Sequence, residues 1–177
     1  MKKFFLFCLA ICMLTGCLTY EGKIFSYTLN KDGSVDLTVT YIGIRSADAD
    51  SVESTYKELV DSYLNGDELL AKFPYGTIQS KRLYEKDGKL NGEVKVRFQT
   101  YADAGIYYNK SKKIVVMGTE PFQLTVDETV AKTNGTKPGT VTGLLIWEED
   151  QRNLVIELSS TGAESGVSLL DTWKKNK

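Results

Sequence analysis

The chain of 177 residues contains no histidine, and this limits the chemistry that it can perform. Serine–histidine–aspartate and cysteine–histidine mechanisms, histidine-ligated zinc and histidine-based proton transfer all need an imidazole. Three cysteines are present, at Cys8, Cys12 and Cys17. Apart from these thiols, catalysis would have to use carboxylate, lysine, tyrosine or serine side chains.

Two groups of acidic residues have the composition that glycoside cleavage needs, which is a pair of carboxyl groups a few ångströms apart. One group is Asp48 with Asp50, and the other runs from Glu148 to Asp150. Both lie in segments predicted to be loops or helix starts, where acidic residues are common for solubility and capping. A carboxylate-based hydrolase is therefore one alternative, and the loop role is the simpler interpretation.

Oxygen-bearing side chains occupy alternate positions of the segment 30–36, which is the spacing at which a calcium-binding loop begins. An EF-hand loop of this register would need glycine where Val35 stands and a bidentate acid where Tyr41 stands. The dipeptide Asp32-Gly33 is typical of a hairpin turn, which explains both residues without a ligand. We therefore expect no metal and no other cofactor.

Three tyrosines, Tyr101, Tyr107 and Tyr108, flank the short segment 102–106. Aromatic side chains in a loop can line the mouth of a ligand site, stack on a sugar or lie at a membrane interface. They can also cover the end of a sheet, which is the more common use of aromatic residues. We treat the three tyrosines as candidate ligand-mouth residues and keep the sheet cover as the alternative.

The amino terminus has the pattern of a secretory signal. Lys2-Lys3 precedes an apolar stretch over residues 4–14, and this order of charge and apolar residues is typical of an exported protein. The stretch is far shorter than the roughly 20 residues that a membrane-spanning helix needs. Two small residues, Thr15-Gly16, then lead directly to Cys17.

The segment Leu14-Thr15-Gly16-Cys17 resembles the lipobox of bacterial lipoproteins. In that family the cysteine thiol receives a diacylglycerol, the signal peptide is cut before the cysteine, and the new amino terminus is usually acylated, for example with palmitate. The resemblance implies that residues 1–16 are removed and that Cys17 is the lipidated first residue. It also implies an exported membrane face: the outer membrane where the source has two membranes, because Leu18 is not the aspartate of a retention signal, and otherwise the outer face of the cell membrane.

Removal of residues 1–16 would leave 161 residues, which suits one domain with its own core. It would also leave Cys17 as the sole thiol, so no intramolecular disulfide is expected. Because two of the 22 basic residues leave with the signal, 20 basic residues remain against 23 acidic ones. This slightly acidic balance argues against nucleic acid as a partner.

Alternation of apolar and polar residues predicts a largely antiparallel sheet with one buried and one solvated face. The predicted strands are 23–29, 35–42, 77–85, 93–100, 113–117, 121–126, 129–132, 141–147 and 153–158.

Residues 17–22 are too few for more than a short tether, so the domain is expected to lie near the lipid surface.

Apolar residues recur at helical spacing after Val52 and predict one main helix over about residues 51–65 that packs against the sheet. Asp50 with Glu53 is a candidate capping box, and Asn65-Gly66 a candidate stop. The polar segment 161–177 is predicted to form a short helix or to fray. The sequence thus predicts a single α+β domain over residues 23–160.

The order of features is also similar to that of the LppM-type small envelope lipoproteins. The features in common are the lipobox, a short spacer, the hairpin Leu29-Asn-Lys-Asp-Gly-Ser-Val-Asp-Leu37, a helical middle, and Thr133-Asn-Gly135 before a strand that ends at Trp147. This resemblance implies an α+β domain with an apolar cavity for lipid-like ligands and no enzyme activity. Members commonly end in a transmembrane helix, for which residues 159–177 are too polar and too few.

These features together predict a lipoprotein of the bacterial cell envelope that acts as a non-catalytic binding module. Its expected partners are the membrane, reached through the N-terminal lipid, and either an apolar or lipid-like ligand or an envelope protein. Two alternatives remain open. One is a carboxylate-based hydrolase acting on envelope glycans, and the other is a structural or assembly component of the envelope.

Overall fold

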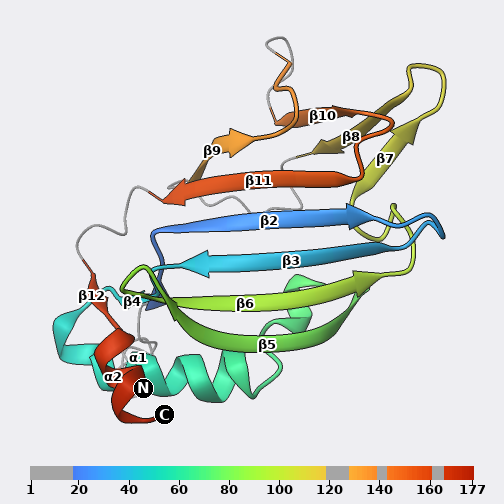
Figure 1. The fold of residues 1–177 in the computed structure, drawn as a ribbon. Coiled ribbons are helices and arrows are strands. Elements are labelled where there is room, and N and C mark those ends of the chain that lie inside the picture. Colours follow the sequence, from blue (N-terminus) through green and yellow to red (C-terminus); the bar gives the residue numbers. More distant parts are fainter. Residues whose placement is uncertain (1–17, 119–127, 139–142, 161–165) are drawn as a thin grey trace, which may run out of the picture.

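The computed structural model describes residues 18–118, 128–138, 143–160 and 166–177, and Figure 1 shows their arrangement. Its strands are β1 (Leu18–Thr19), β2 (Gly22–Leu29), β3 (Val35–Ile42), β4 (Arg45–Ser46), β5 (Gly76–Lys86), β6 (Lys89–Phe98), β7 (Ile106–Asn109), β8 (Ile114–Gly118), β9 (Glu128–Thr133), β10 (Leu144–Glu148), β11 (Asn153–Ser160) and β12 (Val167–Ser168). Its helices are η1 (Ala49–Ser51), α1 (Val52–Glu58), η2 (Leu59–Leu64), η3 (Leu70–Lys72) and α2 (Leu170–Lys175).

The largest sheet has six strands in the order β5-β6-β3-β2-β11-β9, and every neighbouring pair is antiparallel. The predicted β2–β3 hairpin is confirmed. Gly33 adopts a positive φ of 87° in its turn, and the carboxylate of Asp32 accepts a hydrogen bond from the Ser34 amide at 3.0 Å. The prediction of a mostly antiparallel α+β domain is confirmed as well.

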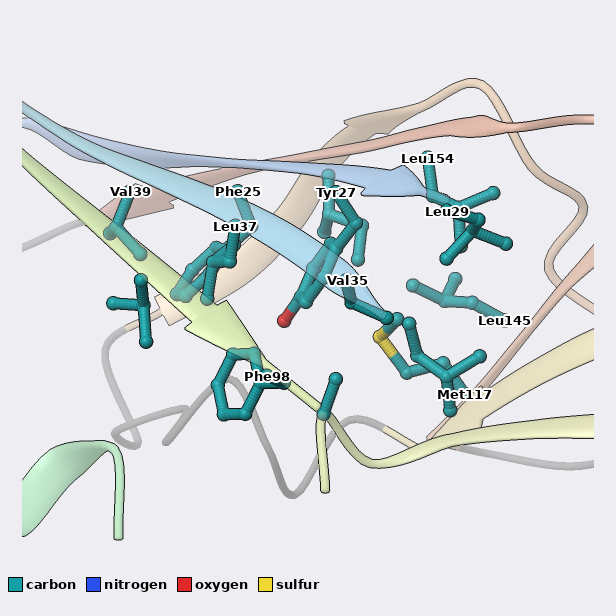
Figure 2. Close-up of a cluster of buried hydrophobic side chains, with 14 of the residues drawn as sticks. Phe25, Tyr27, Leu29, Val35, Leu37, Val39, Phe98, Met117, Leu145 and Leu154 are labelled. Carbon is teal, nitrogen blue, oxygen red and sulfur yellow. The ribbon is translucent and has the colours of Figure 1, made fainter. Parts of the chain in front are cut away.

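A second, three-stranded sheet in the order β10-β8-β7 supplies much of the packing for the inner face of the large sheet. Figure 2 shows Met117 of β8 and Leu145 of β10 lying next to Val35 of β3. All three side chains are at most 1% exposed. The main core therefore forms between two sheets, whereas the sequence predicted the helix as the principal cover.

The helical segment 49–64 is continuous but changes its winding, from 3₁₀ (η1) through α (α1) to π (η2). The predicted capping box at Asp50 is not formed, because Asp48 is the N-cap of this segment. The Asp48 carboxylate accepts a hydrogen bond from the Asp50 amide at 3.1 Å. Asn65 is the C-cap, as predicted, and its amide donates a hydrogen bond to the Val60 carbonyl at 2.9 Å.

Among the described residues, no helix is long and apolar enough to cross a membrane.

The helical segment and α2 build a second apolar cluster at one end of the large sheet. Its buried members are Ile44, Leu59, Leu90, Leu169 and Leu170. The predicted C-terminal helix is therefore ordered as α2, although it starts only at Leu170 because residues 167–168 form β12.

Several strand boundaries differ from the prediction. Residues 86–92 were expected to form a long connection, but β5 and β6 meet at the two-residue turn Asp87-Gly88, where both φ angles are positive (53° and 69°). This geometry is that of a tight hairpin turn. The strand β7 was not predicted, and the predicted strand 121–126 lies outside the described residues.

The segment 18–22 is part of the fold, which differs from the tether predicted for it. β1 pairs with β4, and β2 begins at Gly22. Between them, Glu21 forms ion pairs with Arg45 and with Lys89, and Lys89 Nζ lies 2.5 Å from Glu21 Oε2. Partial burial alone would raise the pKa of Glu21, but the hydrogen bonds from Lys89 and Arg45 outweigh it and hold the pKa below its ordinary value of 4.5.

Replacing Glu21 with glutamine is expected to lower the free energy of unfolding by about 1–2 kcal/mol at neutral pH, because two charge-assisted hydrogen bonds weaken. Since the folded-state pKa lies below the unfolded value, this stabilisation is fully present above pH 4.5 and is lost as the pH falls through the folded-state pKa. Urea unfolding at neutral pH and near pH 3 measures it. A difference between wild type and E21Q that does not shrink in acid would contradict this account.

Candidate functional site

A cavity of about 190 Å³ lies between the helical segments and the large sheet. It lies where the main core and the second cluster meet, since Tyr41 and Tyr63 pack against both, and it is partly open to solvent. Gly92 of β6 contributes no side chain, and a Cβ at this position would come within 3.1 Å of Ile44 Cδ1. The lining residues are Leu18, Tyr20, Lys23, Phe25, Tyr41, Ile44, Leu59, Tyr63, Leu64, Leu69, Lys72, Phe73, Lys81, Arg82, Leu83, Gly92, Glu93 and Val94.

One wall of the cavity carries a buried ion pair. Lys23 of β2 lies 2.8 Å from the Glu128 carboxylate, and the side chains of the two residues are 9% and 2% exposed. The Tyr20 hydroxyl donates to Glu128 at 2.9 Å. The ammonium also lies 4.7 Å from the centroid of the Tyr20 ring and 6.0 Å from that of Tyr41, distances at which a cation is attracted to an aromatic face.

The two tyrosines of this wall stay neutral over the physiological range. Burial, followed by the hydrogen bond to Glu128, raises the pKa of Tyr20 far above its usual value. Burial also raises the pKa of Tyr41 to about 12. Both phenols therefore act as hydrogen-bonding and aromatic groups, and neither is available as a general base near neutral pH.

Basic side chains predominate among the charged groups of the lining. Arg82 makes two hydrogen bonds of 2.9 Å to Glu93, which is the sole carboxylate among the described residues that line the cavity directly. Lys81 Nζ donates to the uncharged main-chain carbonyl of Gly66 at 2.7 Å. Lys23 and Lys72 complete the basic side chains of the described lining. Lys23 is paired with Glu128 and Arg82 with Glu93, so this count sets no preference for the charge of a ligand.

The acidic groups that could have served a hydrolase do not meet in this cavity. Asp48 caps η1, and Glu149 accepts a hydrogen bond from the Tyr108 hydroxyl. A two-carboxylate mechanism needs a second acid beside Glu93, and the described part of the chain places no other acid in the lining. Among the described residues, no group of three His, Cys, Asp or Glu side chains is placed to hold a metal ion.

The segment 30–36, whose spacing resembles a calcium loop, uses its oxygens within the protein. Asp36 accepts hydrogen bonds from Asn30 Nδ2 at 2.8 Å and from Arg97 at 3.0 Å. The Asp32 carboxylate accepts from the Ser34 hydroxyl at 2.6 Å. The guanidinium of Arg97 occupies the place where a cation would balance these carboxylates.

The three candidate ligand-mouth tyrosines are not part of the cavity lining. The Tyr101 hydroxyl donates to the Asn30 carbonyl at 3.1 Å, and its ring packs against the main core. Tyr107 and Tyr108 are on β7 and are 67% and 37% exposed. The structure therefore places Tyr101 as sheet cover, and it places the other two on a different sheet from the cavity.

Lys23, Tyr20 and Tyr41 were not singled out from the sequence, although one signal for Lys23 was present. In the strand 23–29 the positions 23, 25, 27 and 29 share one face, so a lysine heads a row of otherwise buried positions. An inward charge of this kind needs a partner. Its partner, Glu128, is distant in the sequence and carries no local signal.

No protein-family model, curated protein or solved structure matches this chain. Cys17, the predicted lipid acceptor, lies outside the described residues, and its modification stays a prediction. The case for a function therefore depends on the cavity and on the residues around it.

Proposed function

We propose that the chain is a lipoprotein of the bacterial envelope, anchored through lipid on Cys17, and that its domain is a non-catalytic module that binds a small apolar or lipid-like ligand. The observation that carries the proposal is the cavity between the helical segments and the large sheet. Its apolar wall comes from both clusters and includes Phe25, Leu59 and Val94. In this proposal the predicted helix covers the part of the sheet that holds the ligand.

The size of the cavity restricts the ligand. An apolar cavity of about 150 Å³ holds a benzene molecule, so one of about 190 Å³ accepts a few carbon atoms more. This matches a small ring or a segment of one acyl chain, with the rest of a larger lipid remaining outside.

Mass spectrometry of the purified protein tests the proposal directly. Native extraction should recover a stoichiometric apolar or lipid-like molecule, which denaturation releases. A protein that carries no such molecule, and that also fails to bind a dansyl-labelled fatty acid, would refute the ligand-binding function.

Replacing Val94 with phenylalanine is expected to weaken binding of the dansyl-labelled fatty acid at least tenfold. Val94 lines the cavity, so the larger ring can occupy space that a ligand would use. Because the ring can extend into the cavity instead of the packed core, the free energy of unfolding should change by less than about 1 kcal/mol. Fluorescence titration and urea unfolding of the same preparation measure the two quantities.

The matched control is the same substitution two residues further along β6. Val96 is 2% exposed, belongs to the main core and does not line the cavity. V96F should therefore cost about 1–3 kcal/mol of stability through overpacking, while the folded fraction keeps its affinity for the probe. Equal affinities of V94F and wild type would show that the cavity is not the binding site.

A further inference from the structure

Lys81 of the edge strand β5 faces inward, towards the cavity. It pairs with Val94 of β6, which in turn pairs with Val39 of β3, and Val39 pairs with Phe25 of β2. Directly paired residues present their side chains on the same face of a sheet. Lys81 therefore heads a row whose other three members are apolar and at most 5% exposed. The lysine itself is half-buried.

The ammonium of Lys81 has no carboxylate partner among the described residues. Its Nζ donates one hydrogen bond of 2.7 Å, to the main-chain carbonyl of Gly66. By contrast, Lys23, which also faces inward from the sheet, has its own acid in Glu128. An ammonium carries three N–H donors, so two donors of Lys81 remain for water or for a ligand. A charge beside an apolar wall gains from a ligand of opposite sign that enters the same site.

We propose that Lys81 binds the carboxylate of a single-chain fatty acid, whose hydrocarbon chain lies in the cavity. This inference rests on the proposed function, because it uses the same cavity and names the class of its ligand. The two remaining donors of the ammonium match the two oxygens of a carboxylate, and charge-assisted hydrogen bonds of this kind are the strong ones. Val94 and Phe25, which follow Lys81 in the row and line the cavity, supply apolar surface for the first carbons of the chain.

The surroundings of Lys81 favour a carboxylate over a phosphate. Gly66 follows Asn65, the C-cap of the helical segment, so its carbonyl lies at the negative end of that helix. Phosphate sites in proteins combine several amide or guanidinium donors, whereas here the group bonded to the ammonium is an acceptor. The guanidinium of the neighbouring Arg82 is engaged by Glu93. A headgroup with one negative charge therefore fits this position better than one with two.

Titration calorimetry at neutral pH with octanoate, octanol and octyl phosphate tests the proposal, because these probes share one hydrocarbon chain and differ in the headgroup. The purified full chain should bind octanoate about tenfold more tightly than octanol, since only the carboxylate pairs with Lys81. Octyl phosphate should bind no more tightly than octanoate. In K81M the preference for octanoate over octanol should disappear, while octanol binds as it does to the wild type.

Two further variants separate the role in binding from a structural one. K81R keeps the positive charge and should keep the preference for octanoate. K86M removes a charge from an exposed position of β5 that does not line the cavity, and should behave like the wild type. The preference is a ratio of two affinities measured on one preparation, so partial unfolding of a variant does not change it. A lysine that only fastens the helical segment to β5 through Gly66 would lower the stability of K81M and leave this ratio unchanged.

Equal affinities of the wild type for octanoate and octanol, or an unchanged preference in K81M, would overturn the proposal. A preference that is lost in K72M instead would overturn it as well, because Lys72 also lines the cavity. Tighter binding of octyl phosphate than of octanoate would refute the carboxylate. The proposed function survives these results if V94F still weakens binding of the dansyl-labelled fatty acid. If neither that probe nor octanoate nor octanol binds, the proposed function fails, and the role of Lys81 fails with it.

Discussion

Replacing Lys23 with methionine is expected to lower the free energy of unfolding by about 3 kcal/mol, which reduces the folding equilibrium constant more than a hundredfold. The substitution keeps the length and apolar stem of the side chain but removes its charge. The Glu128 carboxylate, with a side chain only 2% exposed, then loses its cation 2.8 Å away and keeps the Tyr20 hydroxyl as a weaker partner. Thermal unfolding should show a decrease of roughly 6–12 °C.

Two controls show whether the loss of stability in K23M comes from the burial of its ion pair or only from the loss of one positive charge. Lys57 and Asp61 form an exposed ion pair in the helical segment, with side chains 79% and 55% exposed, so K57M should leave the free energy of unfolding almost unchanged. The double variant K23M/E128L should regain part of the loss, because apolar residues can replace a buried ion pair at little cost. A loss for K23M no larger than for K57M would mean that the buried pair does not stabilise the fold.

The buried pair illustrates which parts of the fold the sequence could specify. The β2–β3 hairpin is local, because the Asp32-Gly33 turn and the alternation of the flanking strands lie within a few residues. The structure joins the two predicted strands in this way, with Leu29 opposite Val35. The cover of the large sheet is not local. It comes from β7, β8 and β10, and no pattern in one strand shows which other segment will bury its inner face.

Short elements were missed for a related reason. β1, β4 and β12 have two residues each, so alternation cannot be detected in them, and they exist because each pairs with another short strand. The segment 86–92 separates the two predicted strands 77–85 and 93–100 and shows no alternation of its own. Leu90 and Asn91 are nevertheless buried, and Asn91 accepts a hydrogen bond from the Gly43 amide at 2.9 Å, a tertiary contact that no local pattern reveals.

The position of the cavity could not be predicted from the sequence. The ligand expected between helix and sheet stays a prediction, and the structure has a cavity between these elements. The candidate mouth tyrosines do not line this cavity: Tyr101 packs against the main core, and Tyr107 and Tyr108 are on β7. A cluster of tyrosines in the sequence indicates aromatic surface, whereas the cavity depends on tertiary features such as the approach of Leu59 and Leu69 to β6.

Replacing Cys17 with serine should abolish membrane attachment completely, which is the largest effect expected for a single substitution in this chain. In lipoproteins, which the segment 14–17 resembles, the thiol is the group that receives the diacylglycerol. A serine hydroxyl is a much weaker nucleophile than a thiolate. The expected products of C17S are an uncleaved precursor or a protein lost from the membrane fraction, detected by immunoblotting after fractionation and by intact-mass measurement.

Cys8 and Cys12 provide matched controls. C8S and C12S each change a thiol in the apolar stretch 4–14, which precedes the predicted acceptor Cys17, and leave Cys17 itself unchanged. Both variants should be processed and attached like the wild type. Normal cleavage and membrane recovery of C17S would refute the lipoprotein assignment. One acyl chain anchors a protein only marginally, whereas several chains hold it durably. The intact mass of the wild type gives the number of acyl chains on Cys17. It therefore also decides whether the domain, whose cavity wall includes the adjacent Leu18, is held permanently at the bilayer.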